Sequence, residues 1–283
     1  MADIYKKCSR FVLSKYELRS LDCPHPDRSG SEGRAKLYGD QYGFKKGACK
    51  RCDKTFDTTF TKKETCDFHV ERSRKIRGVH KPHGCCGSHF GGKGCRSAPS
   101  HVYIGNLYLD VEGFTRTQPL ASPSADGNYG VYAVDTEAIH TVKGLEVCKV
   151  SVINSSLETV YDEFCLPTTE IIDYNTIWSG IRAEDLQDVT KTWAEMRQDL
   201  LGIFNRKTIL VGHGLGTDLR LLKILHNRVV DTLKLYPHPH GSHLRRSLKD
   251  IAQSFLGRSI QTGEGHDSHE DAEVAMQLVL RKL

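Results

Sequence analysis

The chain of 283 residues lacks any apolar run near the roughly 18 to 20 residues that span a bilayer. Its N-terminus also lacks a signal-peptide core, because Lys6, Lys7 and Arg10 interrupt the few apolar residues there. No internal repeat of solenoid length is present, and a hydrophobic content of 38% excludes collagen-like and fully disordered chains. We therefore expect an intracellular protein in a reducing compartment with no membrane partner, built from one large domain or from a medium and a small one.

Cysteine is nearly absent from the C-terminal part of the chain, and excess negative charge is absent from the N-terminal part. Only Cys148 and Cys165 follow residue 101, whereas the other eight of the ten cysteines precede it. Residues 1–101 carry 22 Lys and Arg against 11 Asp and Glu, a net charge of +11, while the remainder carries 18 against 24, a net charge of −6. Without secretion, dense cysteine and histidine indicate a metal site rather than a disulfide framework.

Composition divides the chain into four segments. Residues 1–45 are polar and basic with few apolar positions, which predicts a loosely structured segment. Residues 46–114 contain the cysteine and histidine residues, and residues 115–128, with two prolines in a polar setting, predict a linker. Residues 129–283 carry strong periodic patterns and predict the main domain.

In the main domain, three strands precede an alternation of helices and strands. Closely spaced strands are expected at 131–134, 145–153 and 159–166, which suggests an antiparallel meander. Further strands are expected at 208–212 and 229–231, and helices at 192–204, 215–225, 247–256 and 268–283. This order predicts an α/β domain with a mixed sheet.

Acidic residues recur where these strands end. Asp135 and Glu137 lie at the end of the first expected strand, and the two-residue period of a strand places both carboxylates on one face. Such carboxylates repel unless a cation holds them, and hard divalent metals favour this ligand type. Two exposed acids on a strand edge are the alternative. Asp218 follows the strand 208–212 in the crevice where α/β folds place ligands, although it would serve equally as a helix cap.

The last acidic group lies in GHDSHEDA, residues 265–272. Asp267 or Ser268 would cap the final helix, and Ser268 with Asp271 matches a capping box, which leaves His266 unexplained. Together the four carboxylates would hold two Mg²⁺ or Mn²⁺ ions that clamp the attacking water and the leaving oxygen of a phosphodiester. His266 would be the general base for that water.

The cysteine segment has spacings typical of structural zinc ligands. CKRC and CDFH, residues 49–52 and 66–69, are two short pairs separated by thirteen residues. We expect one zinc site formed by Cys49, Cys52, Cys66 and His69. A second site would use Cys85, Cys86, Cys95 and His101, with His83 or His89 as another candidate ligand, or one of these residues would replace a ligand of the first site. Isolated reactive thiols are the alternative.

Basic residues surround these ligands and predict contact with nucleic acid. The expected RNA-binding residues are Lys50, Arg51, Arg72, Arg74, Lys75 and Arg77. Phe56, Phe60 and Phe68 lie among them and would either stack on bases or form the small core of the module.

The main domain resembles the DEDDh exonucleases in the order and spacing of six motifs. These motifs are VYAVDTEAIHT, GLEVCKVSVIN, IIDYNTIWSGI, TILVGHGLGTDLRLLKILH, VVDT and GHDSHEDAEVAMQL. Within that group the chain resembles the RNA exonuclease 1 homologue family, the Rexo or GOR-like proteins, and the cysteine pattern extends the resemblance to about residues 46–282. The resemblance implies an RNase H-like fold and 3′ to 5′ release of nucleoside 5′-monophosphates from RNA. It also implies a nuclear location, with the cytoplasm as the alternative.

The resemblance assigns a role to each catalytic candidate. Asp135 would bridge both metals, Glu137 and Asp218 would be the next two acids, Asp271 the last acid and His266 the base. The family commonly has Asp-Cys-Glu-Met where this chain has DTEA at residues 135–138, so the small alanine would loosen packing on the terminal nucleotide. All five positions are intact, which favours an active enzyme over a non-catalytic RNA-binding adaptor. A DNA exonuclease of the same fold, acting on single-stranded DNA, is the other alternative, and no protein partner can be inferred.

Overall fold

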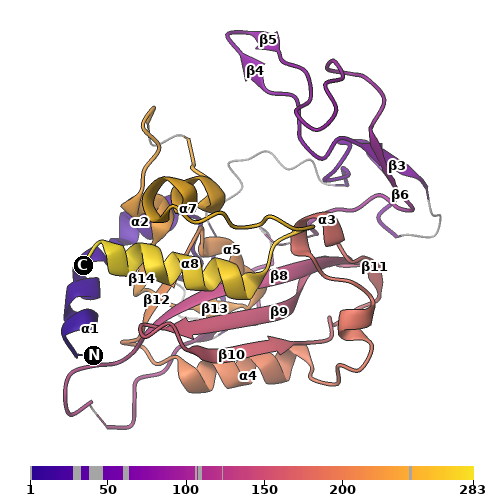
Figure 1. Cartoon of the computed structure of the whole chain (residues 1–283). Helices are drawn as coiled ribbons and strands as arrows, with labels where there is room; N and C mark the ends of the chain where they lie inside the picture. Colours follow the sequence, from indigo (N-terminus) through magenta and orange to yellow (C-terminus); the bar gives the residue numbers. More distant parts are fainter. Residues whose placement is uncertain are drawn as a thin grey trace.

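A computed structural model describes residues 2–27, 33–37, 47–59, 64–105, 107, 110–122, 124–241 and 244–283 (Figure 1). A twisted sheet forms the centre, with helices on both faces, and the cysteine-rich segment projects from one end. Phe60 lies outside the described residues. No helix within these ranges is long and apolar enough to cross a membrane.

The central sheet has six strands in the order β10-β9-β8-β12-β14, with β11 paired to the far end of β8. Strands β8 (Val131–Thr141), β9 (Gly144–Asn154) and β10 (Thr159–Phe164) form an antiparallel meander. Strand β12 (Ile209–Gly212) runs parallel to β8 and to β14 (Val229–Asp231), while β11 (Ile171–Asp173) is antiparallel to β8. The mixed α/β sheet expected from the order of the elements is therefore confirmed.

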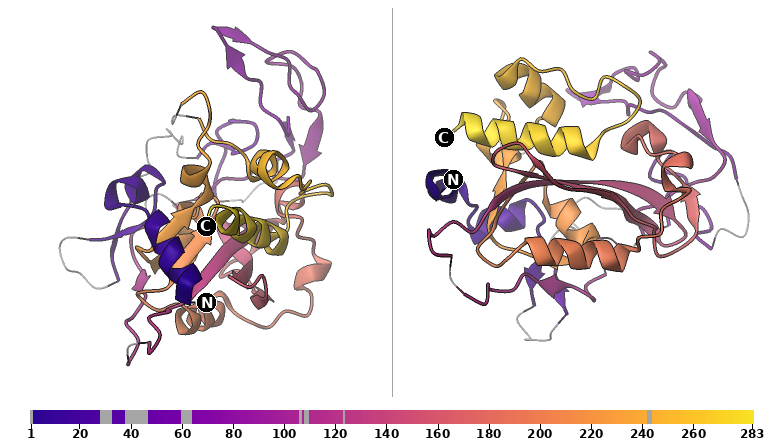
Figure 2. Two further views of the ribbon diagram at one scale, coloured as in Figure 1. Left: turned by 60° about the vertical axis from the view of Figure 1, so that its left-hand side comes forward. Right: turned by 60° about the horizontal axis from the view of Figure 1, so that its bottom comes forward.

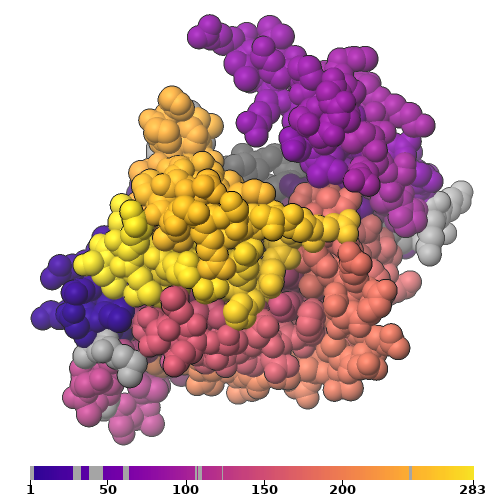
Figure 3. All heavy atoms as spheres, viewed as in Figure 1, coloured from indigo at the N-terminus to yellow at the C-terminus, as the bar shows by residue number. Residues whose placement is uncertain are grey.

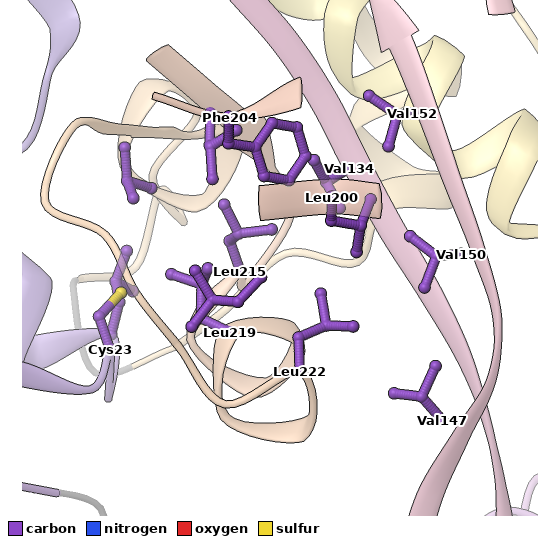
Figure 4. Close-up of a cluster of buried hydrophobic side chains, with 14 of the residues drawn as sticks. Cys23, Val134, Val147, Val150, Val152, Leu200, Phe204, Leu215, Leu219 and Leu222 are labelled. Carbon is purple, nitrogen blue, oxygen red and sulfur yellow. The ribbon is translucent and has the colours of Figure 1, made fainter. Parts of the chain in front are cut away.

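Helices cover the two faces of this sheet (Figure 2, right). On one face α8 (Ser268–Arg281) packs through Ala275 and Met276 against Ala133 of β8. On the other face lie α4 (Trp193–Ile203) and α5 (Gly216–Leu221). Figure 4 shows this second core, in which residues of both helices meet Val134 of β8 and valines of β9. The alternation of Ala133 and Val134 between the two cores sets the faces of β8 as far as Glu137, after which the register with β9 shifts.

Side-chain caps set where the main helices begin. Thr192 forms a full capping box with Glu195 at the start of α4, and Ser247 caps α7 (Leu248–Leu256). Asp267 caps α8, because its side chain accepts a hydrogen bond from the backbone N–H of His269. Asp271 takes no part in this cap and is free for another role. The expected helix at 215–225 is shorter than predicted, since its last residues form β13 (Ile224–Leu225).

The N-terminal segment is more structured than its composition predicts. Residues Ala2–Cys8 form α1, Ser9–Phe11 a 3-10 turn and Lys15–Ser20 helix α2. Cys8 joins the core beneath α8, and Leu18 joins the core beneath α5. The expectation of a loosely structured segment was therefore wrong for residues 2–27, because a few well-spaced apolar side chains suffice to dock short helices on an existing core.

The expected linker is also partly built into the main domain. Strand β7 (Thr115–Arg116) pairs in parallel with β13, and the buried Thr117 hydroxyl lies 2.9 Å from Nδ1 of His226. The remaining short elements are β1 (His25–Pro26) paired with β2 (Ala35–Lys36), α3 (Thr176–Ser179), a 3-10 turn at Glu184–Leu186 and α6 (Thr232–Leu235).

The cysteine-rich segment contains two small hairpins. Strand β3 (Cys66–Phe68) pairs with β6 (Arg96–Ala98), and β4 (Lys75–Ile76) pairs with β5 (Val79–His80). Figure 3 shows this segment in purple, projecting beyond the compact body above the orange and yellow C-terminal part of the chain. The β3–β6 hairpin lies at its base beside α3, and the β4–β5 hairpin lies at its tip (Figure 1).

Candidate active site

The five residues predicted to carry catalysis meet at one cavity of about 460 Å³. Asp135 and Glu137 come from β8, Asp218 from the first turn of α5, Asp271 from the first turn of α8 and His266 from the loop before α8. The cavity lies beyond the carboxyl end of β12, the edge of the sheet at which α/β folds place their ligands. The structure therefore brings together residues separated by up to 136 positions in the chain.

The pleat of β8 places Asp135 and Glu137 on the face covered by α8. Val131 and Ala133 pack against α8, and the two acids continue the same alternation. Glu137 is only 6% exposed, and no described residue donates a hydrogen bond to its Oε1 atom. A buried carboxylate oxygen without a donor is costly unless a proton or a cation satisfies it.

The four carboxyl groups lie in an environment that opposes their ionisation. Burial and the Asp218, Asp271 and Glu137 carboxylates raise the pKa of Asp135 well above its ordinary value. Burial and the Asp271, Asp218 and Asp267 carboxylates raise the pKa of Glu137 to about 9. Burial also raises the pKa of Asp218 to about 7 and that of Asp271 to about 7. Divalent cations bound by these carboxylates would relieve the repulsion at neutral pH, so the residues present fit a divalent-metal site.

Two residues that the sequence analysis did not identify hold Asp218 in place. The hydroxyl of Thr136 donates to Oδ1 of Asp218 at 2.7 Å, from the opposite face of β8 to the acids. The buried carboxylate of Asp231, at the end of β14, accepts from the backbone N–H groups of Gly214 and Leu215 at 3.0 Å each. These bonds fix the turn that leads into α5 and therefore the position of Asp218 on its first turn.

His266 lies beside the last acid. Its Nδ1 atom is 3.5 Å from Oδ2 of Asp271, and its backbone N–H donates to the carbonyl of Trp178 at 2.8 Å. Burial lowers the pKa of His266, with a smaller contribution from the Lys249 charge, so the imidazole is neutral at pH 7 and able to accept a proton. The side-chain amide of Gln261 donates to both oxygens of Asp271, at 3.1 and 2.9 Å.

Several other side chains of the cavity carried no clear signal in the sequence. Trp178 of α3 and Asn175, the residue before α3, line the cavity, as does His213 from the loop after β12. Burial lowers the pKa of His213 to about 4, and its Nδ1 atom is 2.8 Å from the Thr232 hydroxyl, so this imidazole is neutral as well. The motif IIDYNTIWSGI contains two of these residues, but only the fold places them at the site.

Eight cysteine and histidine side chains form two groups that could each hold a metal ion. The first group is Cys49, Cys52, Cys66 and His101, and the second is His69, Cys85, Cys86 and Cys95. Within each group, all four ligand atoms lie within 4.8 Å of one another. The two zinc-ligand sets predicted from the sequence therefore had their histidines exchanged. His101 completes the first group, and His69 completes the second.

The register of the β3–β6 hairpin explains this exchange. Cys66 and Phe68 are buried residues of β3, and His69, the residue after that strand, lies in the second group. Cys66 pairs with Ala98 of β6, which brings the chain that follows, including His101, back to Cys66. His83 stacks on the ring of His69 at 3.7 Å and is not a ligand, and His89 lies in neither group.

Both groups have the dimensions of a tetrahedral zinc site. With Zn–S near 2.3 Å and Zn–N near 2.0 Å, tetrahedral ligands are about 3.8 Å apart for two sulfurs and about 3.5 Å apart for sulfur and nitrogen. Cys49 and Cys66 Sγ are 3.6 Å apart, as are Cys85 and Cys95 Sγ. Nδ1 of His101 is 3.3 Å from Cys52 Sγ, and Nδ1 of His69 is 3.4 Å from Cys86 Sγ. The residues present fit two structural zinc ions.

Comparison with known proteins identifies the main domain. The model of the exonuclease family matches residues 133–279, which include all five predicted catalytic residues. This chain belongs to the exonuclease family. Its sequence is 34% identical over 295 aligned positions to the RNA exonuclease 1 homolog of Homo sapiens, covering all of this chain and 24% of that protein. It is likewise 34% identical to the exonuclease GOR of Pan troglodytes, covering all of this chain and 42% of that protein.

These relatives confirm the predicted RNA exonuclease 1 homologue and GOR-like family. The exonuclease described here spans about a quarter to two fifths of the length of these curated relatives. Its fold is similar to that of the Neurospora crassa Pan2 catalytic unit, a protease and nuclease domain, with a TM-score of 0.50 and 29% identity over 59% of this chain and 29% of that one.

The predicted RNA-binding residues of the exonuclease fall into two classes. Arg74, Lys75 and Arg77 are exposed on or beside the β4–β5 hairpin, and Lys50 is exposed near its base. Arg72 is exposed but also donates to the Lys50 carbonyl at 2.7 Å and to Asp53 at 3.1 Å.

Arg51 is the exception among these basic residues. Its side chain is only 5% exposed and forms a bidentate ion pair with Asp173. The RNA-binding prediction for Arg51 was therefore wrong, because its guanidinium is already engaged within the protein. Of the three phenylalanines, Phe68 is buried and Phe56 packs on the rings of His101 and Tyr103, so both are core residues of the module.

Proposed function

We propose that this exonuclease is a metal-dependent 3′ to 5′ exoribonuclease of the DEDDh type, which removes terminal nucleotides as 5′-monophosphates. The single observation that carries the proposal is the cavity at which four carboxyl groups and one neutral imidazole meet. Four mutually repelling carboxylates are unfavourable for a metal-free binding protein, and they are the ligand set that a two-metal phosphodiesterase requires. Membership of the exonuclease family supports the dependence on divalent metal.

Each residue of the site has a defined part in this proposal. Asp135, Glu137, Asp218 and Asp271 would hold two Mg²⁺ or Mn²⁺ ions, which supply Lewis-acid stabilisation of the phosphodiester and lower the pKa of the attacking water. His266 accepts the proton of that water, since its imidazole is neutral and lies at the rim of the cavity beside Asp271. Thr136 and Gln261 orient the carboxylates of Asp218 and Asp271 through the hydrogen bonds described above.

The preference for RNA rests on the relatives, several of which are named RNA exonucleases. The exposed β4–β5 hairpin is the proposed site of contact with the RNA backbone. Arg74, Lys75 and Arg77 lie there beside Ile76 and Val79, which are 51% and 62% exposed. Substitution of Lys75 and Arg77 by alanine should weaken RNA binding and reduce the slope of log affinity against log salt by about one per cation. An unchanged slope would remove the hairpin from the RNA-binding surface.

We propose structural zinc for both cysteine and histidine groups, in the pairing described above. Neither group lines the catalytic cavity, and each has four protein ligands, which leaves no open position for substrate. Zinc would supply the folding energy that a module with so small a core lacks. The six thiols of these two groups are thereby accounted for without a disulfide, in agreement with the free cysteines of the structure.

The experiment that tests the function uses matched RNA and DNA oligonucleotides of one sequence with a free 3′-hydroxyl. With Mg²⁺, we expect the protein to shorten the RNA one nucleotide at a time and to act more slowly on DNA. Asp135→Ala should abolish shortening and leave RNA binding intact. A preference for DNA would refute the RNA assignment, and equal behaviour of wild type and Asp135→Ala would refute the catalytic assignment and favour a non-catalytic RNA-binding protein.

A further inference from the structure

The first cysteine and histidine group contacts the main domain through a buried arginine. Arg51 lies between the ligands Cys49 and Cys52, and its backbone N–H donates to Cys49 Sγ at 3.4 Å. Its guanidinium donates two hydrogen bonds of 2.7 Å to the two carboxylate oxygens of Asp173, at the end of β11. Such a fork of two charge-assisted hydrogen bonds is stronger and more directional than a single hydrogen bond.

The same guanidinium packs against two aromatic rings that also contact each other. Its central carbon is 5.1 Å from the ring centroid of Phe68 on β3 and 5.2 Å from that of Trp178 on α3. The two rings are 5.9 Å apart. We call the four residues Arg51, Asp173, Phe68 and Trp178 the Arg51 clamp. Two members belong to the cysteine module and two to the main domain, so the clamp joins these parts.

The main-domain side of the clamp continues directly into the active site. Trp178 lines the catalytic cavity, and its carbonyl accepts from the backbone N–H of His266 at 2.8 Å. Asp173 also accepts from the backbone N–H of Asn175 at 2.7 Å, and the Asn175 amide donates to the carbonyl of Ala138, next to Glu137, at 3.3 Å. A continuous set of contacts therefore runs from the first metal group to the base and to one of the acids.

We infer that the first cysteine and histidine group is a positioning element of the active site, with Arg51 as the residue through which it acts. This inference rests on the proposed nuclease function. With a metal ion bound, Cys49 and Cys52 would hold the turn that carries Arg51. Arg51 in turn holds Asp173 and Trp178, so that the Trp178 carbonyl keeps His266 in place. Loss of that metal or of the guanidinium allows the cavity wall to move, and small displacements of a base reduce catalysis strongly.

Trp178 provides a direct report of the clamp, because the chain has only two tryptophans. In a Trp193→Phe background, Trp178 is the only indole, and its emission maximum and acrylamide quenching measure its environment. We expect Arg51→Ala to shift the emission to the red and to increase quenching. Arg51→Lys keeps the charge but not the planar fork, so it should give a smaller shift of the same sign. Lys54→Ala, which removes an exposed cation from the same turn, is the matched control and should change neither.

Kinetics and metal content distinguish positioning from RNA binding and from a loss of structure. Arg51→Ala should retain both zinc ions and reduce kcat on the order of tenfold, with KM for RNA unchanged within about twofold. Asp173→Asn breaks the fork from the main-domain side, and it should reproduce both effects even where Arg51→Ala does not fold. Cys49→Ser should move the Trp178 emission in the same direction, and Cys95→Ser, in the second group, should not.

Two results would overturn the inference. A raised KM with unchanged kcat and unchanged Trp178 emission would make Arg51 an RNA ligand. Equal Trp178 emission in Cys49→Ser and the wild-type holoprotein would separate the metal from the clamp. The fluorescence measurement needs no substrate. An inactive wild type would therefore refute the proposed function, and the Trp178 emission would still decide whether the first group positions the Arg51 clamp.

Discussion

Thr136 offers the sharpest test of how the acids of the site are controlled. Its hydroxyl donates a hydrogen bond of 2.7 Å to Oδ1 of Asp218, and Asp218 is only 9% exposed. Thr136→Val keeps the branched shape of the side chain and removes only the donor. Asp218 then has to ionise without this partner.

The expected magnitude follows from the strength of such a bond. A hydrogen bond to a charged group contributes about 1.5 to 3 kcal/mol, which corresponds to roughly a tenfold to hundredfold change in an equilibrium constant. Burial already raises the pKa of Asp218 to about 7, and the Thr136 hydrogen bond acts in the opposite direction. Its loss therefore raises this pKa further. A protonated carboxyl cannot ligate a metal, so the Mg²⁺ concentration for half-maximal activity should rise about tenfold or more.

The assay is a Mg²⁺ titration of single-turnover RNA shortening at about pH 6.5 and about pH 8.5. The defect of Thr136→Val should be larger at the lower pH, where proton and metal compete for Asp218. Thr141→Val removes a buried hydroxyl from the other end of β8 and serves as the matched control. An unchanged Mg²⁺ requirement, or a defect of equal size at the two pH values, would show that the Thr136 hydroxyl does not control Asp218.

Three further predictions follow from the same structure. The pKa values of about 7 for Asp218 and Asp271 exceed those of carboxyls in an unfolded chain. The metal-free protein should therefore lose stability as pH rises from about 4 through about 7, and Mg²⁺ should raise the melting temperature more at about pH 8 than at about pH 5. A melting temperature that does not change with pH would contradict the raised pKa values of these two buried carboxyls. Metal analysis should show that Cys49→Ser loses one of two zinc ions. Adding His101→Gln to Cys49→Ser should remove no further zinc, whereas adding His69→Gln to Cys49→Ser should remove the second ion. The opposite pattern would restore the ligand sets predicted from the sequence. Leu200→Ala empties a fully buried position of the core beneath α4 and should cost about 2 to 5 kcal/mol in urea unfolding, whereas a cost below about 1 kcal/mol would contradict close packing there.

Local patterns in the sequence were sufficient to predict the elements that carry the catalytic candidates. The alternation around Asp135 and Glu137 is a property of a single strand, so their shared face followed from spacing alone. The helix starts near Asp218 and Asp271 were equally local. The motifs in order predicted the family, and the family match then confirmed it.

The parts that failed depend on contacts between distant segments. Which histidine completes each metal group depends on the register between β3 and β6, and spacing along the chain carries no information about that register. Arg51 resembled any other surface cation because its partner Asp173 lies 122 residues away. Thr136 gave no signal, since its role depends on α5 passing over that face of β8.

The proposed function is hydrolysis of RNA from its 3′ end at the acids of this cavity with divalent metal. It is tested most directly by comparing one RNA labelled at its 5′ end with the same RNA labelled at its 3′ end, in Mg²⁺, under single-turnover conditions. We expect a ladder of progressively shorter products from the 5′ label and immediate release of a labelled nucleoside 5′-monophosphate from the 3′ label, both absent in Asp271→Asn. Internal cleavage, release of mononucleotide from the 5′ end, or an unchanged ladder in Asp271→Asn would contradict it.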